Sequence, residues 1–241
     1  KLFHHASPIP NIVLDDFLEK NFFDLLQEKN ENSNENSGRS FSSKSEKNKW
    51  ISLNTDISKQ LSKIVSCLNS QQWVNNLVEL TDIDTLHSTQ HGNTELANYH
   101  EMGPGGFLAP HVDHSFEPIT GKPHVLNIIL FLSKNWEPSF GGATLFYDQW
   151  GRKLIKKINY KPNRAVIFLH TPYSFHCVEE ISEKNNILRK SIYVDYYSNS
   201  LDPYRNLKLN FSKKWFKHGT TFKLENFTDY LNPKNFSYTY T

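Results

Sequence analysis

The sequence has few cysteines and no long apolar segment, and both absences narrow the class of protein. Only Cys67 and Cys177 occur among 241 residues, too few for a disulfide framework, so a hydrophobic core must hold the fold together. No run of 18 or more apolar residues is present, so we expect no transmembrane helix and no membrane partner. No signal peptide is visible either, and together these features predict a cytoplasmic protein.

An excess of charge of either sign is also missing. Lys and Arg total 27 against 25 Asp and Glu, which leaves a formal net charge of +2. Nucleic-acid surfaces carry a concentrated positive charge, so this balance gives no reason to expect a nucleic-acid partner. The segment "KKWFK" (213–217) mixes basic and aromatic residues, and we interpret it as a packed ring between solvated lysines. The oligomeric state stays open at this point.

Apolar residues are plentiful enough for one large core, at 37% of the chain with 14% aromatics. We therefore predict a single domain over residues 1–241. Its N-terminal support, 11–93, is expected to be helical. Residues 11–28 open with a short apolar run and continue as an amphipathic helix, and residues 56–80 have the apolar spacing of one or two helices.

A polar insertion interrupts this helical part. Residues 29–49 are nearly all Asn, Ser, Glu and Lys, a composition that cannot bury itself, so we expect a loop. Two interpretations remain open. The loop is either a surface insertion, which is the commoner behaviour of such segments, or a lid that orders over a substrate.

The core of the fold is predicted between residues 94 and 198, where short strand-like runs alternate with Gly- and Pro-containing turns such as "GPGG" and "EPSFGG". The runs are 94–101, 106–112, 124–132, 143–148, 152–158, 165–170, 174–178 and 189–197. About eight short strands separated by turns are typical of a sandwich or barrel, and a jelly roll fits the count. The aromatic tail, 199–241, is expected to pack on this core as a C-terminal extension.

The stretch "APHVDHSF" (109–116) holds the first candidate metal ligands. His111 and Asp113 lie two residues apart, and on a strand such residues point to the same face. One imidazole and one carboxylate can then reach one ion. The two-histidine, one-carboxylate set of non-haem iron needs one more histidine from another strand. His114 points to the opposite face and is expected at the rim of the site.

His176 is the best candidate for that third ligand. It begins a strand-like segment, "FHCVEEI", that follows a complete strand and turn, and in a jelly roll a returning strand can lie beside an early one. His170, which ends the preceding apolar run, is the rival. A single histidine is more often a hydrogen-bonded or surface residue than a ligand.

An anchor for an anionic ligand is predicted in "LRKSIYVDYY". Arg189 and Ser191 share one strand face with Tyr193 and Asp195. A guanidinium can form a bidentate pair with a carboxylate, and the hydroxyl adds a donor. The neighbouring Lys190 leaves open which cation points inward.

In this order, His111-x-Asp113, His176 and Arg189-x-Ser191 resemble the iron(II)- and 2-oxoglutarate-dependent dioxygenases, and more narrowly their prolyl-4-hydroxylase-like branch. The glycine-rich approach "GPGGFLAPHVDHS" and the strand, turn and strand "LNIILFLSKNWEPSFGGATLFYD" are similar to that branch. The resemblance covers roughly residues 11–198, and its order, spacing and flanking strands agree with one another.

The resemblance implies a fold, a ligand set and cofactors. The fold is a double-stranded β-helix, or jelly roll, with helices packed on one side. His111, Asp113 and His176 are implied as iron ligands, and Arg189 as the partner of the 2-oxoglutarate C5 carboxylate. Ser191, Tyr99 and Asn127 are further candidates for cofactor contacts, and no catalytic residue beyond the metal ligands is implied. Fe(II), 2-oxoglutarate and O2 are the implied cofactors, with ascorbate as an additional candidate.

The implied activity is hydroxylation of an organic substrate, with release of succinate and CO2. The substrate is a peptidyl proline or a small metabolite, so the expected partner is a peptide or a small molecule. Two alternatives stay open. One is a non-catalytic or zinc-binding jelly-roll module of the cupin type, and the other is a nucleic-acid dealkylating member of the same superfamily.

Overall fold

The structure, a computed structural model, describes residues 3–26, 38–52, 58–89, 99–117, 120–184, 186–200, 202–207 and 220–221. Its helices are α1 (Lys20–Leu25), α3 (Lys59–Leu68), α4 (Gln71–Thr81) and the 3-10 turn η1 (Pro138–Phe140). Its strands are β1 (Asn11–Leu14), β2 (Arg39–Phe41), β3 (Glu46–Ser52), β4 (Leu86–Ser88), β5 (Tyr99–Val112), β6 (His124–Phe131), β7 (Thr144–Tyr147), β8 (Leu154–Ile158), β9 (Ala165–Leu169), β10 (His176–Val178), β11 (Arg189–Ser198) and β12 (Thr220–Thr221).

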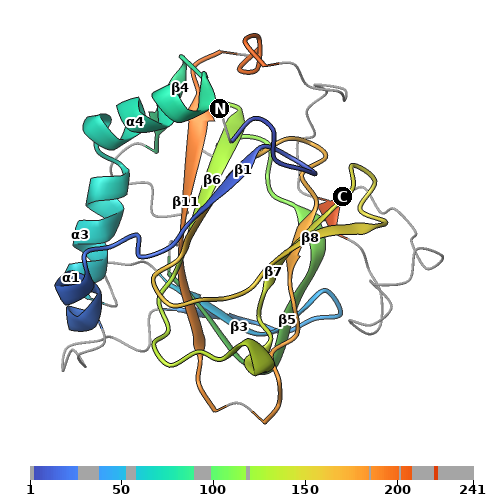
Figure 1. Ribbon diagram of the computed structural model, residues 1–241. Helices are drawn as coiled ribbons and strands as arrows, with labels where there is room; N and C mark the ends of the chain where they lie inside the picture. Colours follow the sequence, from blue (N-terminus) through green and yellow to red (C-terminus); the bar gives the residue numbers. More distant parts are fainter. Residues whose placement is uncertain are drawn as a thin grey trace.

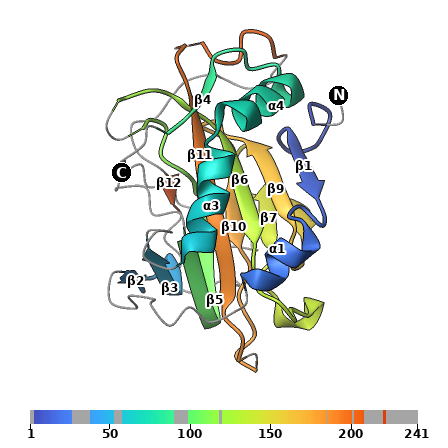
Figure 2. The same ribbon diagram turned by 90° about the vertical axis from the view of Figure 1, so that its left-hand side faces the viewer.

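All strand pairs are antiparallel and belong to one sheet, whose main path runs β1-β9-β6-β11-β5-β10-β7-β8. Figure 1 shows this sheet curled into a partial barrel, with α1, α3 and α4 outside it. Figure 2 shows α3 in front of the strands β6 and β11, with α4 above it and α1 below. The predicted fold class, mainly β with helices on one side, is confirmed. The helices of the described segments are too short or too polar to cross a membrane.

Helices α3 and α4 form where the sequence predicted one or two helices, over 56–80. The helix predicted within 11–28 is confined to α1, and the region predicted to be helical, 11–93, also contributes β1 and β4, which pair with β9 and β11. Ser58 caps α3 by accepting a hydrogen bond from the Leu61 N–H, and Ser70 caps α4 in the same way through Trp73, so each helix start gains an acceptor for a free N–H group. Helix α4 ends where Asp82 adopts a left-handed conformation. The apolar positions of both helices pack on the outer face of the sheet, for example Leu61 and Leu77.

Strand β11 shows how the sheet separates two environments. Ile192, Val194 and Tyr196 belong to the core shared with the helices, whereas Tyr193 and Asp195 line a cavity on the other face. The alternation follows from the two-residue period of a strand. On β11, one face therefore joins the core shared with the helices, and the other places polar side chains beside the apolar residues of an inner cluster such as Ile129 and Phe168.

The prediction of a loop over 29–49 was wrong for its second half. Residues 39–41 and 46–52 form β2 and β3, and β3 pairs with β5, for example Trp50 with Glu101. β2 is mostly exposed and β3 mostly half-buried, so neither needs apolar alternation and neither gives a strand signal, and backbone pairing with β5 outweighs the polar composition. Residues 29–37 lie outside the described residues, and so do most of the tail and its "KKWFK" segment.

The glycine-rich run 103–106 was expected to end a strand, but β5 continues through it. Gly105 has a φ of +66°, and a Cβ on Gly106 would lie 2.6 Å from the Gly103 carbonyl oxygen. Glycine thus permits a local irregularity that would otherwise break the strand. The register of the β3 pairing shifts at the same place, between Lys47 and Lys49.

Candidate metal centre

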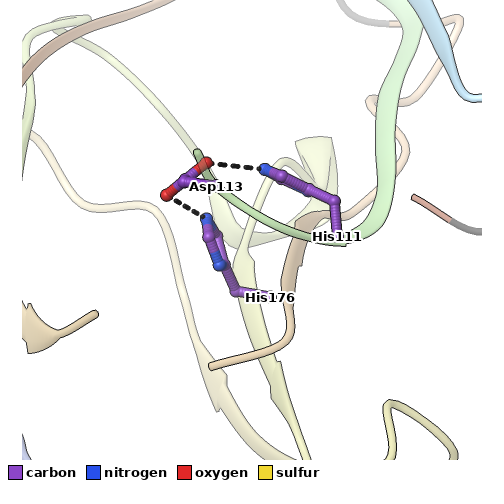
Figure 3. A group of neighbouring side chains, drawn as sticks. All are labelled: His111, Asp113 and His176. Atoms are coloured by element: carbon purple, nitrogen blue, oxygen red, sulfur yellow. Dashed lines mark ion pairs between the residues drawn. The ribbon is translucent and has the colours of Figure 1, made fainter. Parts of the chain in front are cut away.

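His111 and His176 face each other across adjacent strands. They are register partners on β5 and β10, and their ring centroids lie 4.4 Å apart. Asp113 follows the end of β5. Its carboxylate oxygens lie 3.2 Å from His111 Nε2 and 3.5 Å from His176 Nε2, as Figure 3 shows. One ligand atom from each residue fits within 4.8 Å of the others, so one ion can contact all three.

The hydrogen bonds of the two rings fix which nitrogen faces this cluster. His111 Nδ1 lies 2.8 Å from the Ala109 carbonyl oxygen, and His176 Nδ1 lies 3.0 Å from that of Ser174. A carbonyl oxygen only accepts, so each Nδ1 donates, which leaves Nε2 as the ring nitrogen that faces Asp113. Three potential ligand atoms therefore converge, which is the arrangement that a metal ion completes.

Electrostatics keep the cluster in its ligating state. Burial lowers the pKa of His176 to about 4, so its ring is neutral at pH 7. Burial alone would raise the pKa of Asp113, but the adjacent His176 and His111 favour the carboxylate and hold its pKa well below the usual range. Neutral imidazoles and an ionised carboxylate are the forms that bind a divalent metal.

Asn127 supports the carboxylate from β6. Its Nδ2 donates to Asp113 Oδ2 at 2.7 Å, and its side chain is buried. The sequence predicted Asn127 as a contact of the cofactor. In the structure it contacts a candidate ligand instead, which fixes the orientation of that carboxylate.

Arg189 is a buried cation without a buried counter-charge. Only 2% of the residue is exposed, and among the described residues it forms no ion pair. Its Nε donates to the Gly142 carbonyl oxygen at 2.8 Å and its Nη1 to Ser191 Oγ at 3.3 Å, but Nη2 has no hydrogen-bond partner there. An unpaired buried charge is costly, so the site favours an anionic ligand.

Glycine and aromatic rings form the walls around this guanidinium. A Cβ on Gly142, whose φ is +71°, would lie 3.2 Å from Arg189 Cδ and 3.0 Å from the Trp136 ring. The rings of Phe131 and Tyr160 lie 5.1 Å from the guanidinium carbon, within cation–π range. Lys190 points away and lies 3.6 Å from Glu101 at the surface. Of the two cations left open by the sequence, the inward one is Arg189.

A cavity of about 210 Å³ adjoins the three candidate ligands. It is lined by all three and by His100, Thr144 and Tyr193 among others. A separate, much smaller cavity is lined by Arg189 and Ser191 and shares His100 and Tyr193 with the first. The candidate metal ligands and the candidate anion anchor therefore line neighbouring cavities.

Tyr99 lies outside that cavity. It pairs with Ile192, so its side chain faces the helices, and its hydroxyl donates to Glu101 at 2.7 Å. The next residue, His100, points inward beside Ser191 and stacks on Tyr193 with ring centroids 4.3 Å apart. Because side chains alternate along β5, His100 rather than the predicted Tyr99 faces the cavity. The sequence did not single out His100, and its only signal was that it follows Tyr99 in the predicted strand 94–101.

The remaining histidines form a separate stack. His170 is fully buried and lies 4.1 Å from the His124 ring, and His114 lies 4.8 Å from the other side of His124, centroid to centroid. His170 does not join the ligand cluster of the described residues. His114 also lines the cavity, and its Nε2 lies 2.9 Å from the Tyr197 hydroxyl oxygen, so its side chain is not directed away from the site as the strand period predicted. The chain leaves β5 at Val112, and that period ends there.

The comparisons with known proteins agree with this geometry. Residues 95–197, less than half of the chain, match the family model described as the 2OG-Fe(II) oxygenase superfamily. No curated protein sequence matches the chain significantly.

Three solved structures illustrate the structural likeness. A Pseudomonas putida prolyl-4-hydroxylase superposes with a TM-score of 0.56 at 14% identity, covering 82% of this chain and 97% of its own. A Trichoplax adhaerens prolyl hydroxylase in complex with a hypoxia inducible factor peptide gives 0.53 at 17% identity, covering 78% and 83%. Streptomyces hygroscopicus HygX with nickel, 2-oxoglutarate and hygromycin B gives 0.52 at 7% identity, covering 87% and 93%.

At these identities the structural likeness establishes the fold, and the family match adds the sequence signature over the part of the chain that holds His111, Asp113, His176 and Arg189. The resemblance inferred from the sequence is confirmed: over residues 95–197 this chain matches the 2OG-Fe(II) oxygenase superfamily, on a jelly-roll fold shared with prolyl-4-hydroxylases.

Proposed function

We propose that this protein is an Fe(II)- and 2-oxoglutarate-dependent dioxygenase that hydroxylates an organic substrate. The observation that carries the proposal is the pairing of two incomplete sites on neighbouring cavities. Three converging ligand groups lack a cation, and one buried guanidinium lacks an anion among the described residues. Iron(II) and the distal carboxylate of 2-oxoglutarate complete both.

Each residue then has a defined task. His111, Asp113 and His176 would hold the iron through three sites and leave the other positions open for ligands. Asn127 keeps the Asp113 carboxylate oriented. Arg189, with Ser191 beside it, would bind the C5 carboxylate of 2-oxoglutarate and so fix the cosubstrate along the cavity.

The bound iron, 2-oxoglutarate and dioxygen supply the oxidising chemistry, in which 2-oxoglutarate becomes succinate and CO2 and one oxygen atom enters a C–H bond of the substrate. The protein contributes position and a dry environment. Ile129 and Val178 line the cavity with apolar surface, and the walls around Arg189 are aromatic. Excluding water from such a site limits side reactions of the oxidant.

The substrate class follows from analogy and is the finer part of the proposal. One structural neighbour is a prolyl hydroxylase with a bound peptide, and another holds the small molecule hygromycin B. Both support a carbon centre presented at the mouth of the cavity, in a peptidyl proline or in a small metabolite.

The test is release of succinate from 2-oxoglutarate by the purified protein under air, with iron(II), and with a panel of prolyl peptides and small metabolites. We expect succinate release that requires iron and that selected substrates accelerate. Arg189→Met is the matched variant, and it should need far more 2-oxoglutarate. Tight zinc binding with no 2-oxoglutarate consumption and no iron binding would support the alternative, a non-catalytic jelly-roll module.

A further inference from the structure

The cavity has a second charged position that the proposed chemistry does not use. Asp195 lies on the same inward face of β11 as Arg189 and Ser191 and lines the cavity. Six residues separate it from Arg189, or about 20 Å along a strand. The chain thus places a cation at one end of this strand face and a carboxylate at the other, beside the candidate metal ligands.

Two imidazoles lie beside Asp195. His124 Nδ1 lies 2.9 Å from the His114 carbonyl oxygen, so Nδ1 donates, and Nε2 is the nitrogen that faces Asp195. That Nε2 lies 3.6 Å from an Asp195 oxygen and has no hydrogen-bond partner among the described residues. His114 Nε2, at 4.0 Å from the other oxygen, already contacts the Tyr197 hydroxyl.

Asn127 places an amide oxygen beside this carboxylate. It is the register partner of Asp195 on β6, so the two side chains stand opposite each other with Cβ atoms roughly 5 Å apart. Its Nδ2 is engaged by Asp113, while its buried Oδ1 has no hydrogen-bond partner in the described part of the chain. A buried amide oxygen without a donor costs free energy, so the position favours a ligand that donates.

No lysine or arginine of the described residues pairs with this carboxylate, and its nearest basic groups are the imidazoles of His124 and His114, at 3.6 and 4.0 Å. Lys49 lines the cavity, but its Nζ bonds Glu46 at 3.1 Å on the β3 strand. Asp195 remains partly accessible, with 20% of its side chain exposed. A carboxylate and an amide oxygen therefore lie opposite each other without a lysine or arginine partner.

We propose that Asp195, with Asn127 Oδ1 opposite it, forms a subsite for a cationic group of a small-molecule substrate, an ammonium or a guanidinium. Such groups present several N–H donors and a positive charge, which is what a carboxylate beside an unsatisfied amide oxygen recognises. A cavity of about 210 Å³ suits a small molecule. Since Asn127 touches both Asp113 and this corner, the reacting carbon lies within a few bonds of the cation.

This inference rests on the proposed function, because it assigns the substrate end of the same cavity. It separates the two substrate classes left open above. The ring of a peptidyl proline carries no charge and supplies no donor to Asp195, so the subsite favours a basic metabolite over a peptidyl proline.

The experiment is ligand-observed NMR on the full chain, first without metal and then with zinc(II) and 2-oxoglutarate. The probes are n-butylammonium and n-butylguanidinium, with butyrate and 1-pentanol as anionic and neutral matches. We expect the cations to bind at least tenfold more tightly than either match. Asp195→Asn should remove at least tenfold of that affinity and Asp195→Glu should restore part of it, whereas Glu137→Gln, an exposed carboxylate outside the cavity, should leave it unchanged.

Equal binding of cations and neutral probes by the folded wild-type protein overturns the subsite, and so does undiminished cation binding in a folded Asp195→Asn. If the Asp195 variants do not fold, the probe preference of the wild type decides alone. Failure of the proposed function has a different signature, because 2-oxoglutarate would then not bind, with or without zinc, while the cation preference of the metal-free chain would persist.

Discussion

On strand β11, the two faces of the curled sheet carry different kinds of side chain. On β11, Ile192 and Val194 face the helices and are buried among apolar neighbours, while Arg189, Ser191 and Asp195 face the cavity. The outer face gains free energy on burial. The inner face bears the cost of desolvating charges that a ligand would then stabilise. Stability and ligand binding should therefore respond to different sets of substitutions.

The largest effect on stability is expected on the outer face. Ile192→Ala removes a fully buried side chain from the core shared with the helices and should lower the free energy of unfolding by about 2–5 kcal/mol. Denaturant unfolding measures this. Ile192→Val is the matched control, at about 0.5–1.5 kcal/mol. The folded variants should bind metal as the wild type does, and a loss of metal affinity that exceeds the loss of folded protein would contradict the separation of the two faces.

Arg189→Met should weaken ligand binding while leaving stability nearly unchanged. The unfolding free energy of the ligand-free protein should move by no more than about 1 kcal/mol, because the loss of the Gly142 hydrogen bond is offset by removal of an unpaired buried charge. The affinity for 2-oxoglutarate should fall by at least about 2 kcal/mol, roughly 30-fold. Calorimetric titration of 2-oxoglutarate with manganese(II) present measures it.

Lys190→Met is the control for that variant, since Lys190 points to the surface and its removal should leave 2-oxoglutarate binding unchanged. If Lys190→Met weakened the binding of 2-oxoglutarate and Arg189→Met did not, the anchor would be misassigned.

Asn127→Ala should act through the carboxylate it orients. Its Nδ2 bonds Asp113, and loss of such a supporting hydrogen bond typically weakens metal binding about 10- to 100-fold. Titration of cobalt(II), followed by its absorption spectrum, measures the change. Metal affinity equal to that of the wild type would show that the bond has no positioning role.

The smallest effect lies outside both faces, at a surface ion pair. Arg164 and Lys161 hold the pKa of Asp15 at about 2, chiefly through the hydrogen bond from Arg164. A carboxyl whose pKa is lower in the folded protein adds stability above pH 4, and this stability is lost as the pH falls from about 4 to 2. Because the pair is largely exposed, Asp15→Asn should cost no more than about 1 kcal/mol at pH 7 and nothing near pH 2. Unfolding curves at both pH values test this, and a cost that persists at pH 2 would contradict the assignment.

Much of the candidate site could be predicted from the sequence, because it depends on the order of the residues along the chain and on which strand face they share. Strand period placed His111 with Asp113 on one face and Arg189 with Ser191 on another, and the family resemblance supplied His176, over its rival His170, as the third member of the cluster. The structure brings each set together. Their roles as ligands and anchor remain predictions for the binding experiments above.

What the sequence could not supply was register. A one-residue difference in how β5 meets β11 decides whether Tyr99 or His100 faces the cavity, and no local pattern fixes that pairing. The same holds for β2 and β3, whose polar residues form strands because β5 offers them a partner. The acceptor corner at Asp195 depends on pairing between β6 and β11, which is likewise invisible in either segment alone.

The most direct test of the central claim is anaerobic calorimetric titration of iron(II) into the wild type and into Asp113→Ala, each with and without 2-oxoglutarate, alongside thermal unfolding of both. We expect the wild type to bind one equivalent of iron, and to bind 2-oxoglutarate only after iron. In Asp113→Ala the iron affinity should be at least about 100-fold weaker, with a nearly unchanged melting temperature. Unchanged iron affinity in a folded Asp113→Ala would contradict it.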